Sequence, residues 1–490
     1  MNNKKLTRSA IAWILVLLSV FSVYSCSENV GGEKKKESET ISGEETPQLK
    51  NYGGSEFRIL SFVDRYGGYY FYDGSDIDAR EETGDNVNDA VYMRNRTIEE
   101  RYNIKIERIE SEDPVGLAQK TIAADTDEYD AMFPPLRRGM RELPQNGYLV
   151  DLKSIPYLDL SKPWYDQSAN EQLSVGGKLY GVIGDFTVMD KNDTNMQLFN
   201  KKIVNDLNLE SPYDLVNQGK WTADKMIELN KVATIDLDGD GKMGPSDQYG
   251  NGGADWDLYG TMVSMGFQII KKDKDDLPEY VGLDETGVNV FLKLMSLFGD
   301  KTHYIRAGDY AGKYPGDSVW WDFMNVNFME NRILFYVGDM GGVKEFRGMD
   351  ADFGIIPFPK YDENQAGYHS PVSEASMLTV PVTAPDLEKV SVIMDALYAE
   401  SKNTLIPAYY EVQLKTKLSR DEESAAMLDY IFSARRYDFV LIYNWGGADG
   451  EIRNLMLTNN LNIVSKLEKI APKIKADMEK AVESILSNNQ

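Results

Sequence analysis

Alternating strand and helix patterns in the first third of the chain constrain its fold more than any other feature. Short apolar strand patterns and amphipathic helix patterns follow one another in the order 57–62, 86–102, 104–109, 115–124 and 128–136. Along 86–102, residues that recur every three or four positions form one face of the expected helix. Arg94 lies on this face between Val91 and Ile98. Strands separated by helices form parallel sheets, because each helix carries the chain back to the start of the next strand. We therefore expect an α/β fold.

Length, charge and two rare residue types narrow the class of protein. A chain of 490 residues is too long for one hydrophobic core and predicts two or three domains. The formal net charge of −25 excludes binding of nucleic acid or anionic lipid by bulk electrostatics. One cysteine excludes an internal disulfide, and two histidines leave little material for a zinc site or for histidine-based catalysis.

The N-terminus has the pattern of an export signal. Three basic residues precede an apolar run at 10–23 that is shorter than a typical membrane span. The segment 23–26 resembles the bacterial lipoprotein box, whose cysteine is acylated; a plain signal peptide with an incidental cysteine is the alternative. We expect residues 1–25 to be removed and Cys26 to anchor the protein at the extracytoplasmic face of the cell membrane. Residues 26–50 have almost no apolar side chain, which predicts a flexible tether.

Polar side chains follow two strand patterns of the predicted sheet. Asp64, Arg65 and Tyr69 come after the first pattern, and Arg137 comes after the third. Ligands of open α/β sheets bind beyond the carboxyl ends of the strands. Each of these residues alone is an ordinary loop residue, but together they are a candidate binding rim.

A polar connector between the apolar runs 180–183 and 196–199 carries Asp185 and Asp190. The two runs are typical of strands that belong to successive α/β units. The connector is therefore expected to pass from one lobe to another beside a cleft, and 370–383 is expected to return to the first lobe. Both aspartates become candidate ligand-binding residues.

Three segments carry a family resemblance through their order: GYLVDLKSIPYLD at 147–159, GKLYGVIGDFTV at 177–188 and MQLFNKKIVNDLNLESPYDLVNQGKWTADKM at 196–226. They are similar to motifs of the extracellular solute-binding proteins of carbohydrate ABC transporters, the maltose-binding-protein-like family. The chain departs from that pattern at Ile183, where proline is common, and in an insertion before Trp221. The resemblance implies a two-lobed, periplasmic-binding-protein-like (type II) fold with a cleft between the lobes.

The resemblance also implies a division of the chain and a function. Lobe 1 would contain 51–188 and about 374–412, and lobe 2 would contain 189–373 and about 413–490. Such a monomeric lipoprotein would capture an extracellular carbohydrate, expected to be an oligosaccharide, by closing its lobes, and would deliver it to ABC permease subunits. No catalytic constellation is expected. There is also no GxxxxGK[ST] loop, so ATP hydrolysis would belong to a partner.

Sugar recognition requires flat apolar faces for ring CH groups and planar polar groups for hydroxyls. Tryptophan supplies the first, and carboxylates and guanidinium groups supply the second. The candidate ligand-binding residues beyond those already named are Trp256, Trp320, Trp321, Trp445 and Asp339. For Trp445, a position in the core is an equal alternative.

Residues 236–247 match the twelve-residue calcium loop of EF-hand type, with acidic residues at positions 1, 3, 5 and 12 and glycine at position 6. The expected ligands are the carboxylates of Asp236, Asp238, Asp240 and Asp247 and the backbone carbonyl of Lys242. A helix pattern precedes the loop at 222–234, but none follows it. We therefore expect a structural Ca²⁺ clamp rather than a paired sensor, with an acidic turn without metal as the alternative.

Three alternatives to carbohydrate capture stay open at this point. The same fold could bind a peptide or polyamine, because the acidic excess suits a cationic ligand. It could also act as a sensor rather than in transport. A secreted glycoside hydrolase is the third alternative, since a pair of carboxylates can perform acid and nucleophile work.

Overall fold

The computed structural model describes residues 50–64, 73–314, 318–372, 374–416 and 422–487. The expected signal, Cys26, nearly all of the tether, Arg65 and Tyr69 lie outside these residues. None of the helices described is both long and apolar enough to cross a membrane.

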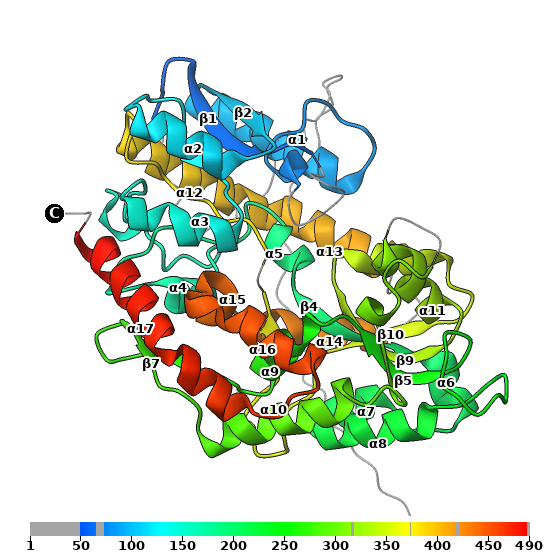
Figure 1. Ribbon diagram of the computed structural model, residues 1–490. Helices are drawn as coiled ribbons and strands as arrows, with labels where there is room; N and C mark the ends of the chain where they lie inside the picture. The colour runs from blue at the N-terminus through cyan, green and yellow to red at the C-terminus, as the bar shows by residue number, and fades with distance from the viewer. Residues whose placement is uncertain (1–49, 65–72, 315–317, 373, 417–421, 488–490) are drawn as a thin grey trace, which may run out of the picture. The chain divides into compact units, whose positions relative to one another are not determined.

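The first three strands form a parallel sheet, as the alternating patterns predict. The strands are Ser55–Phe62 (β1), Ile104–Ser111 (β2) and Ala131–Met132 (β3), and their order in the sheet is β2-β1-β3. Helices Asn86–Tyr102 (α1) and Pro114–Ala123 (α2) connect them (Figure 1). Asp85 starts α1 by accepting hydrogen bonds from two N–H groups of the first turn, and Asn103 ends it in the left-handed conformation.

The third strand is shorter than the sequence pattern predicts. Phe133 follows β3 and still donates to the Leu60 carbonyl at 2.7 Å, but Pro134 and Pro135 come next, and a proline has no N–H to donate to a sheet ladder. Helix α3 (Leu136–Glu142) begins immediately after the two prolines. The prediction that the strand continues to residue 136 is therefore wrong.

A second sheet of five strands is mixed rather than parallel. Its order is β10-β4-β9-β5-β8, with strands Phe353–Ile356, Asn195–Asn200, Ile333–Asp339, Tyr249–Gly253 and Tyr304–Arg306. β5 is parallel to β8 and β9, whereas β4 is antiparallel to β9 and β10. The register pairs Asn195 with Asp339. The start of β4 therefore lies at the same edge as the carboxyl ends of β5, β8 and β9.

Two segments link the regions around the two sheets. The run 180–183 forms an isolated bridge between Val182 and Leu378 instead of the expected strand, and the connector that follows contains the short helix α5 (Met189–Asn192). The returning segment pairs with the first region, because Thr379 bridges Met132. The expected return to the region of the first sheet is thus confirmed for 376–381, whereas Ser370–Pro371, at the start of the expected segment, pairs with Arg435–Arg436.

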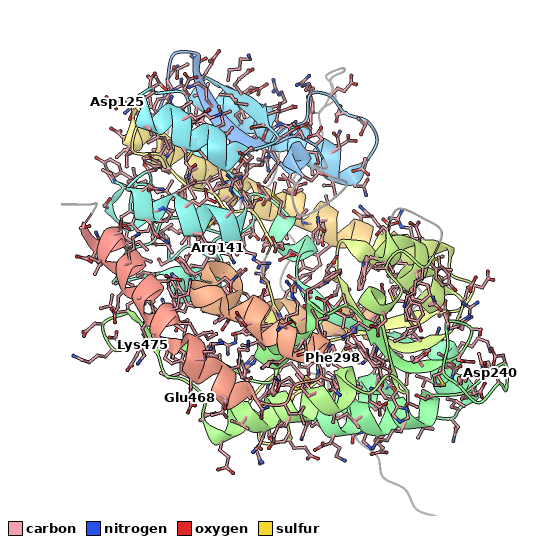
Figure 2. The ribbon with its side chains drawn as sticks, viewed as in Figure 1. Asp125, Arg141, Asp240, Phe298, Glu468 and Lys475 are labelled. Carbon is pink, nitrogen blue, oxygen red and sulfur yellow. The ribbon has the colours of Figure 1, made fainter. Side chains whose placement is uncertain are left out.

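The last part of the chain is helical, as expected, and contacts both regions. Helix α12 (Leu387–Asn403) packs on α1, and α15 (Phe439–Tyr443) packs on α3. Arg141 of α3 donates to the Ile442 carbonyl at 2.6 Å. The long helix α17 (Ile463–Ser487) runs beside α16 (Ala448–Leu457) and the short strand β7 (Pro278–Tyr280) (Figures 1 and 2). Near its end, the Ile485 carbonyl accepts a hydrogen bond from Tyr180 at 3.0 Å.

The remaining elements complete these layers. The helices are α4 (Gln167–Leu173), α6 (Lys201–Asp206), α7 (Pro212–Asn217), α8 (Ala223–Ala233), α9 (Asp257–Ser264), α10 (Glu285–Phe298), α11 (Val326–Met329), α13 (Leu405–Thr416) and α14 (Glu422–Ser433). The strands are β6 (Ile270–Lys272), β7 (Pro278–Tyr280), β11 (Ser370–Pro371) and β12 (Arg435–Arg436). Short 3₁₀ turns and a π-helix (η6, Trp320–Asn325) lie between them. The helix expected over 318–331 is thus a π-helix that continues as α11.

Candidate ligand-binding site

An aromatic wall stands beyond the carboxyl end of β5. Trp256 lies in the turn between β5 and α9, and 53% of its surface is exposed. Its ring centroid is 5.7 Å from that of Trp320, which in turn stacks on the buried Tyr336 at 5.3 Å and 24°. An indole face that is open to solvent next to a second indole can pack against an apolar ring face, so this wall is a candidate ligand-binding surface.

Carboxylates surround this aromatic wall. Asp255 precedes Trp256, Asp257 opens α9, and Asp339 ends β9. Asp257 is buried and accepts the Ala254 N–H at 2.7 Å. Burial raises the pKa of Asp257 to about 7, and the charges of Asp255 and Asp339 act in the same direction. The site therefore combines flat rings with carboxylate hydrogen-bond acceptors, and the pKa of one of them, Asp257, lies near neutral pH.

Gly253 makes this close packing of acids and rings feasible. A Cβ atom at this position would lie 2.5 Å from the Asp257 carboxylate and 2.6 Å from the Tyr304 hydroxyl. Glycine is thus required here because side chains from two other elements occupy the space.

A row of charged residues leads from this edge to the first region. On α16, Asp449 and Arg453 lie one turn apart, and Arg453 pairs with Asp255 at 3.5 Å. Asp449 pairs with Arg137 at 3.7 Å, and Arg137 also forms an ion pair with Glu374. Burial raises the pKa of Asp449, although the Arg137 charge opposes this shift. The row connects α3, the returning segment and the β5–α9 turn, so a ligand at this edge would meet groups from both regions.

The two aspartates of the connector lie in a buried ion network instead. Asp190 is 1% exposed and forms an ion pair with Arg435, and Lys191 is 3.5 Å from both Asp190 and Asp185. Arg435 also binds Asp166 at 2.8 Å. Burial raises the pKa of Asp185, and Lys191 partly offsets this. A ligand could reach Asp190 only by displacing these cations, whereas the Asp185 side chain is 19% exposed.

Three further predicted residues have other surroundings. Asp64 is exposed and pairs with Arg108 at 2.6 Å. Trp445 is 5% exposed and stacks on Tyr443 with centroids 4.6 Å apart and an interplanar angle of 15°, which is a core environment. The position of the Trp321 side chain lies outside what the structure describes, as do Arg65 and Tyr69.

The structure therefore gathers four of the predicted residues, Trp256, Trp320, Asp339 and Arg137, and adds five that the sequence reasoning missed. The added residues are Asp255, Asp257, Glu374, Asp449 and Arg453. The sequence does contain a pattern that could have predicted two of them. Asp449 and Arg453 are opposite charges four residues apart, directly after the turn at Gly446 and Gly447, which is the spacing of an ion pair on a helix. The others are single acids among 78 and have no distinguishing pattern.

The acidic loop between α8 and β5 brings together three of the four carboxylates that are expected as ligands. Ligand-type oxygens of Asp236, Asp238 and Asp240 lie within 4.8 Å of one another. Gly241, at φ +79°, makes the turn that the loop requires, and its N–H binds Asp236 at 2.8 Å. That hydrogen bond is the main reason why the pKa of Asp236 is lowered. Figure 2 shows Asp240 on this loop, at the periphery of the view.

Asp247, the last residue of the loop, is buried rather than exposed. It is 1% exposed, and its two oxygens accept the N–H groups of Leu237 and Gly244 at 2.9 and 2.7 Å. It thereby closes the loop on itself. No lysine or arginine in the described part of the chain forms an ion pair with Asp236, Asp238 or Asp240, so their charges lack a protein counter-ion.

The raised pKa of Asp257 predicts that stability falls as pH rises. Between the unfolded-state pKa near 4 and the folded-state pKa near 7, the folded protein retains a proton that the unfolded chain releases. The free energy of unfolding should therefore decrease from about pH 4 to about pH 7 and change little above it. In urea titrations between pH 5 and 8, Asp257→Asn should show a smaller decrease, and Asp127→Asn, at an exposed aspartate, should match the parent. An identical decrease in the Asp257→Asn protein would contradict the assignment.

Comparison with known proteins identifies the fold. No model of a known protein family matches the sequence, and no curated protein matches it. A sugar transporter protein of Rhizobium etli, solved in an open conformation, is 13% identical, and the alignment covers 88% of this chain and 99% of that chain with a TM-score of 0.57. An ABC substrate-binding protein of Listeria monocytogenes in complex with cycloalternan is 14% identical, with coverages of 87% and 99% and a TM-score of 0.53.

A third solved structure has a different type of ligand. UgpB from Mycobacterium tuberculosis, in complex with glycerophosphocholine, is 14% identical, with coverages of 88% and 100% and a TM-score of 0.53. All three alignments span nearly the whole of the compared structures. The chain therefore has the two-lobed α/β fold of the solute-binding proteins of ABC transporters.

Proposed function

We propose that this protein is a substrate-binding lipoprotein that captures an extracellular carbohydrate and delivers it to an ABC permease. The observation that carries the proposal is the half-exposed Trp256 beside Trp320, at a strand edge where charged groups from both regions converge. Rings of this kind pack on sugar CH faces, and the surrounding carboxylates and guanidinium groups bind hydroxyls. The fold of sugar-binding proteins supports this choice.

The remaining parts of the proposal follow from the sequence. Cys26 would carry the lipid that holds the protein at the outer face of the membrane, and the protein would act as a monomer without catalysis. Closure of the two lobes on the ligand would generate the form that a permease recognises. The ion pairs of Arg137 with Glu374 and Asp449 would be among the contacts that differ between open and closed forms.

A thermal-shift panel with chemical analysis tests the proposal. The purified protein would be heated with linear and cyclic oligosaccharides, monosaccharides, a glycerophosphodiester, peptides and polyamines. A rise of Tm with a sugar, and with the sugar recovered unchanged, is the expected result, because a ligand that binds only the folded state stabilises it by mass action. New reducing ends would indicate a hydrolase, and a response to polyamines alone would favour a cationic ligand for the acidic edge.

We further propose that the acidic loop binds Ca²⁺ as a structural clamp. Three clustered aspartates without a protein counter-ion supply the hard oxygens that Ca²⁺ prefers, and Lys242 adds a backbone carbonyl. Asp247 would act mainly by holding the loop closed, because its oxygens already accept two N–H groups. Bound Ca²⁺ would neutralise the mutual repulsion of the carboxylates and keep the start of β5 in place.

Removal of Ca²⁺ should lower thermal stability, and Asp236→Ala should abolish this response. A free Ca²⁺ concentration one hundred times Kd stabilises a folded protein by about 2.7 kcal/mol. Differential scanning calorimetry in Ca²⁺ and in chelator measures the difference. Asp273→Ala is the matched control, because Asp273 also holds a loop through the N–H groups of Asp275 and Leu277 but lies outside the acidic loop. Equal Tm values of the parent protein in Ca²⁺ and chelator would refute the clamp.

A further inference from the structure

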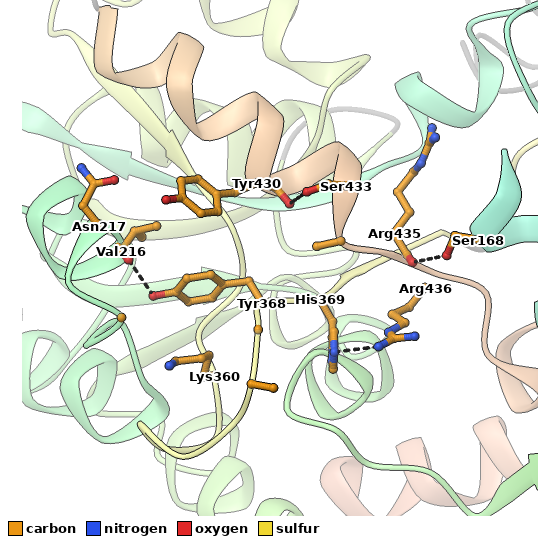
Figure 3. A pocket seen from close by; sticks show the side chains of 14 residues that line it. Ser168, Val216, Asn217, Lys360, Tyr368, His369, Tyr430, Ser433, Arg435 and Arg436 are labelled. Atoms are coloured by element: carbon orange, nitrogen blue, oxygen red, sulfur yellow. Dashed lines mark hydrogen bonds between the residues drawn. The ribbon is translucent and has the colours of Figure 1, made fainter. Parts of the chain in front are cut away.

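A pocket of about 600 Å³ lies between the ends of several elements and contains no acidic residue. Its fourteen lining residues are Ser168, Val216, Asn217, Gly219, Lys360, Ala366, Gly367, Tyr368, His369, Tyr430, Ser433, Ala434, Arg435 and Arg436. Figure 3 shows Lys360 and the two tyrosines on one side, and His369, Arg436 and Ser168 on the other. Three cationic side chains and no carboxylate are unexpected in a chain with 78 acids and 53 basic residues.

Two of these cations have no acidic partner. Lys360 is only 6% exposed, and its ammonium group donates to the Glu363 carbonyl at 3.3 Å. Arg436 contacts the His369 ring at 3.0 Å. Among the described residues, neither has a carboxylate within ion-pair distance. Arg435 differs, because Asp166 and Asp190 bind it from outside the pocket lining. Lys360 is a buried cation without a counter-ion, which is costly, whereas Arg436 is half-buried; an anion in the pocket would remove the cost at Lys360 and pair with Arg436.

His369 orients one of the cations. Burial, followed by the charge of Arg436, lowers the pKa of His369 to about 4, so the ring is neutral at pH 7. A neutral ring nitrogen can accept a hydrogen bond, and Arg436 is the donor that faces it. The remaining N–H groups of the Arg436 guanidinium stay available for a planar anion.

The walls of the pocket suit a small organic body attached to the anion. The rings of Tyr368 and Tyr430 lie 6.4 Å apart at 85° to each other, and the Lys360 ammonium is 5.6 Å from the Tyr368 centroid. Hydroxyl groups of Ser168 and Ser433 border the same space. Apolar ring faces next to cations and hydroxyls bind molecules that have a charged end and a less polar body.

The pocket is separate from the aromatic wall. Gln365, next to the lining residue Ala366, donates to the Ser264 carbonyl at the C-terminal end of α9, whereas Trp256 precedes its N-terminal end. A helix of eight residues is about 12 Å long. We propose that this pocket is a second binding site, for a small carboxylate or phosphate monoester, distinct from the site at Trp256.

Titration calorimetry with four anions tests the second site. Glucose 6-phosphate, glucuronate, inorganic phosphate and acetate would be titrated at constant ionic strength, with glucose as the uncharged control. We expect saturable binding of at least one organic anion, and at least tenfold weaker binding in Lys360→Met and in Arg436→Gln. Lys231→Met removes the same charge at an exposed position outside the pocket and should bind as the parent does. Binding of none of the anions, or equal losses in all three variants, would overturn the proposal.

Two additional variants separate this result from folding defects and from the first site. Ser433→Asp places a carboxylate at an exposed position of the lining and should abolish anion binding without changing Tm, which keeps the test informative if a buried variant fails to fold. Trp256→Ala should leave anion binding unchanged. Loss of anion binding in Trp256→Ala would place the anion at the first site and refute a separate pocket.

Discussion

Replacement of Arg94 by methionine is expected to lower the free energy of unfolding by about 3–5 kcal/mol, as is typical when one partner of a buried charged network is removed. Arg94 is fully buried on α1. Its guanidinium donates to the Phe186 carbonyl at 2.7 Å and to the carbonyls of Asp76 and Ile77 at 2.9 Å each. It also lies 4.5 Å from the Phe186 ring centroid. Methionine fills part of the volume but leaves the Phe186 and Asp76 carbonyls without this donor, whereas the Ile77 carbonyl keeps the hydrogen bond from Asn95 at 3.0 Å.

The loss should be measured by urea unfolding at pH 7, with Arg96→Met as the control. Arg96 lies on the same helix, its side chain is 44% exposed, and its ion pair with Glu99 is of the surface type. The control should therefore change stability by less than about 1 kcal/mol. Similar stabilities of Arg94→Met and the parent would show that water or relaxation of the 76–77 turn satisfies these carbonyls.

Removal of the Trp256 side chain is expected to weaken sugar binding by about 1–3 kcal/mol, roughly five- to 150-fold in Kd. A half-exposed indole contributes little to the fold, so Tm without ligand should stay unchanged. A sugar ring that covers the indole would lose its largest apolar contact when alanine replaces it. Calorimetric titration with the sugar identified in the thermal-shift panel measures the effect.

Tyr157→Ala is the matched control for the indole. Tyr157 is 71% exposed and belongs to the loops before the first crossing, far in sequence from the β5–α9 turn. This variant should bind the sugar as tightly as the parent. If both variants bind normally, the sugar does not contact the aromatic wall, and the site would have to involve other surfaces of the cleft.

Local patterns were sufficient to predict the first sheet and its helices. The spacing along 86–102 placed Arg94 on the same helix face as Val91 and Ile98, and all three are buried. The prediction is reliable here because the longer strands and helices show a clear hydrophobic periodicity in the sequence. Local patterns could not predict the strand order of the mixed second sheet. The antiparallel pairing of β4 with β9 joins residues that are over a hundred positions apart in the sequence.

The candidate site was predicted less completely, because residues of the same type differ in how tertiary packing buries them. Trp256 and Trp445 look alike in the sequence, but the first is half-exposed and the second stacks on Tyr443 in the core. Asp190 is buried against Arg435, a residue 245 positions away. Which face a residue presents, and which distant cation it meets, are decided by tertiary contacts that a single sequence does not display.

The contacts between the last helices and the first region determine when this protein can finish folding. Arg141 binds a carbonyl at position 442, and Tyr180 binds one at position 485. A ribosome that has made only the first 440 residues has therefore not yet produced the partners that complete the N-terminal part of the molecule. The region around the first sheet therefore gains these contacts only after the residues at 442 and 485 have been added to the chain.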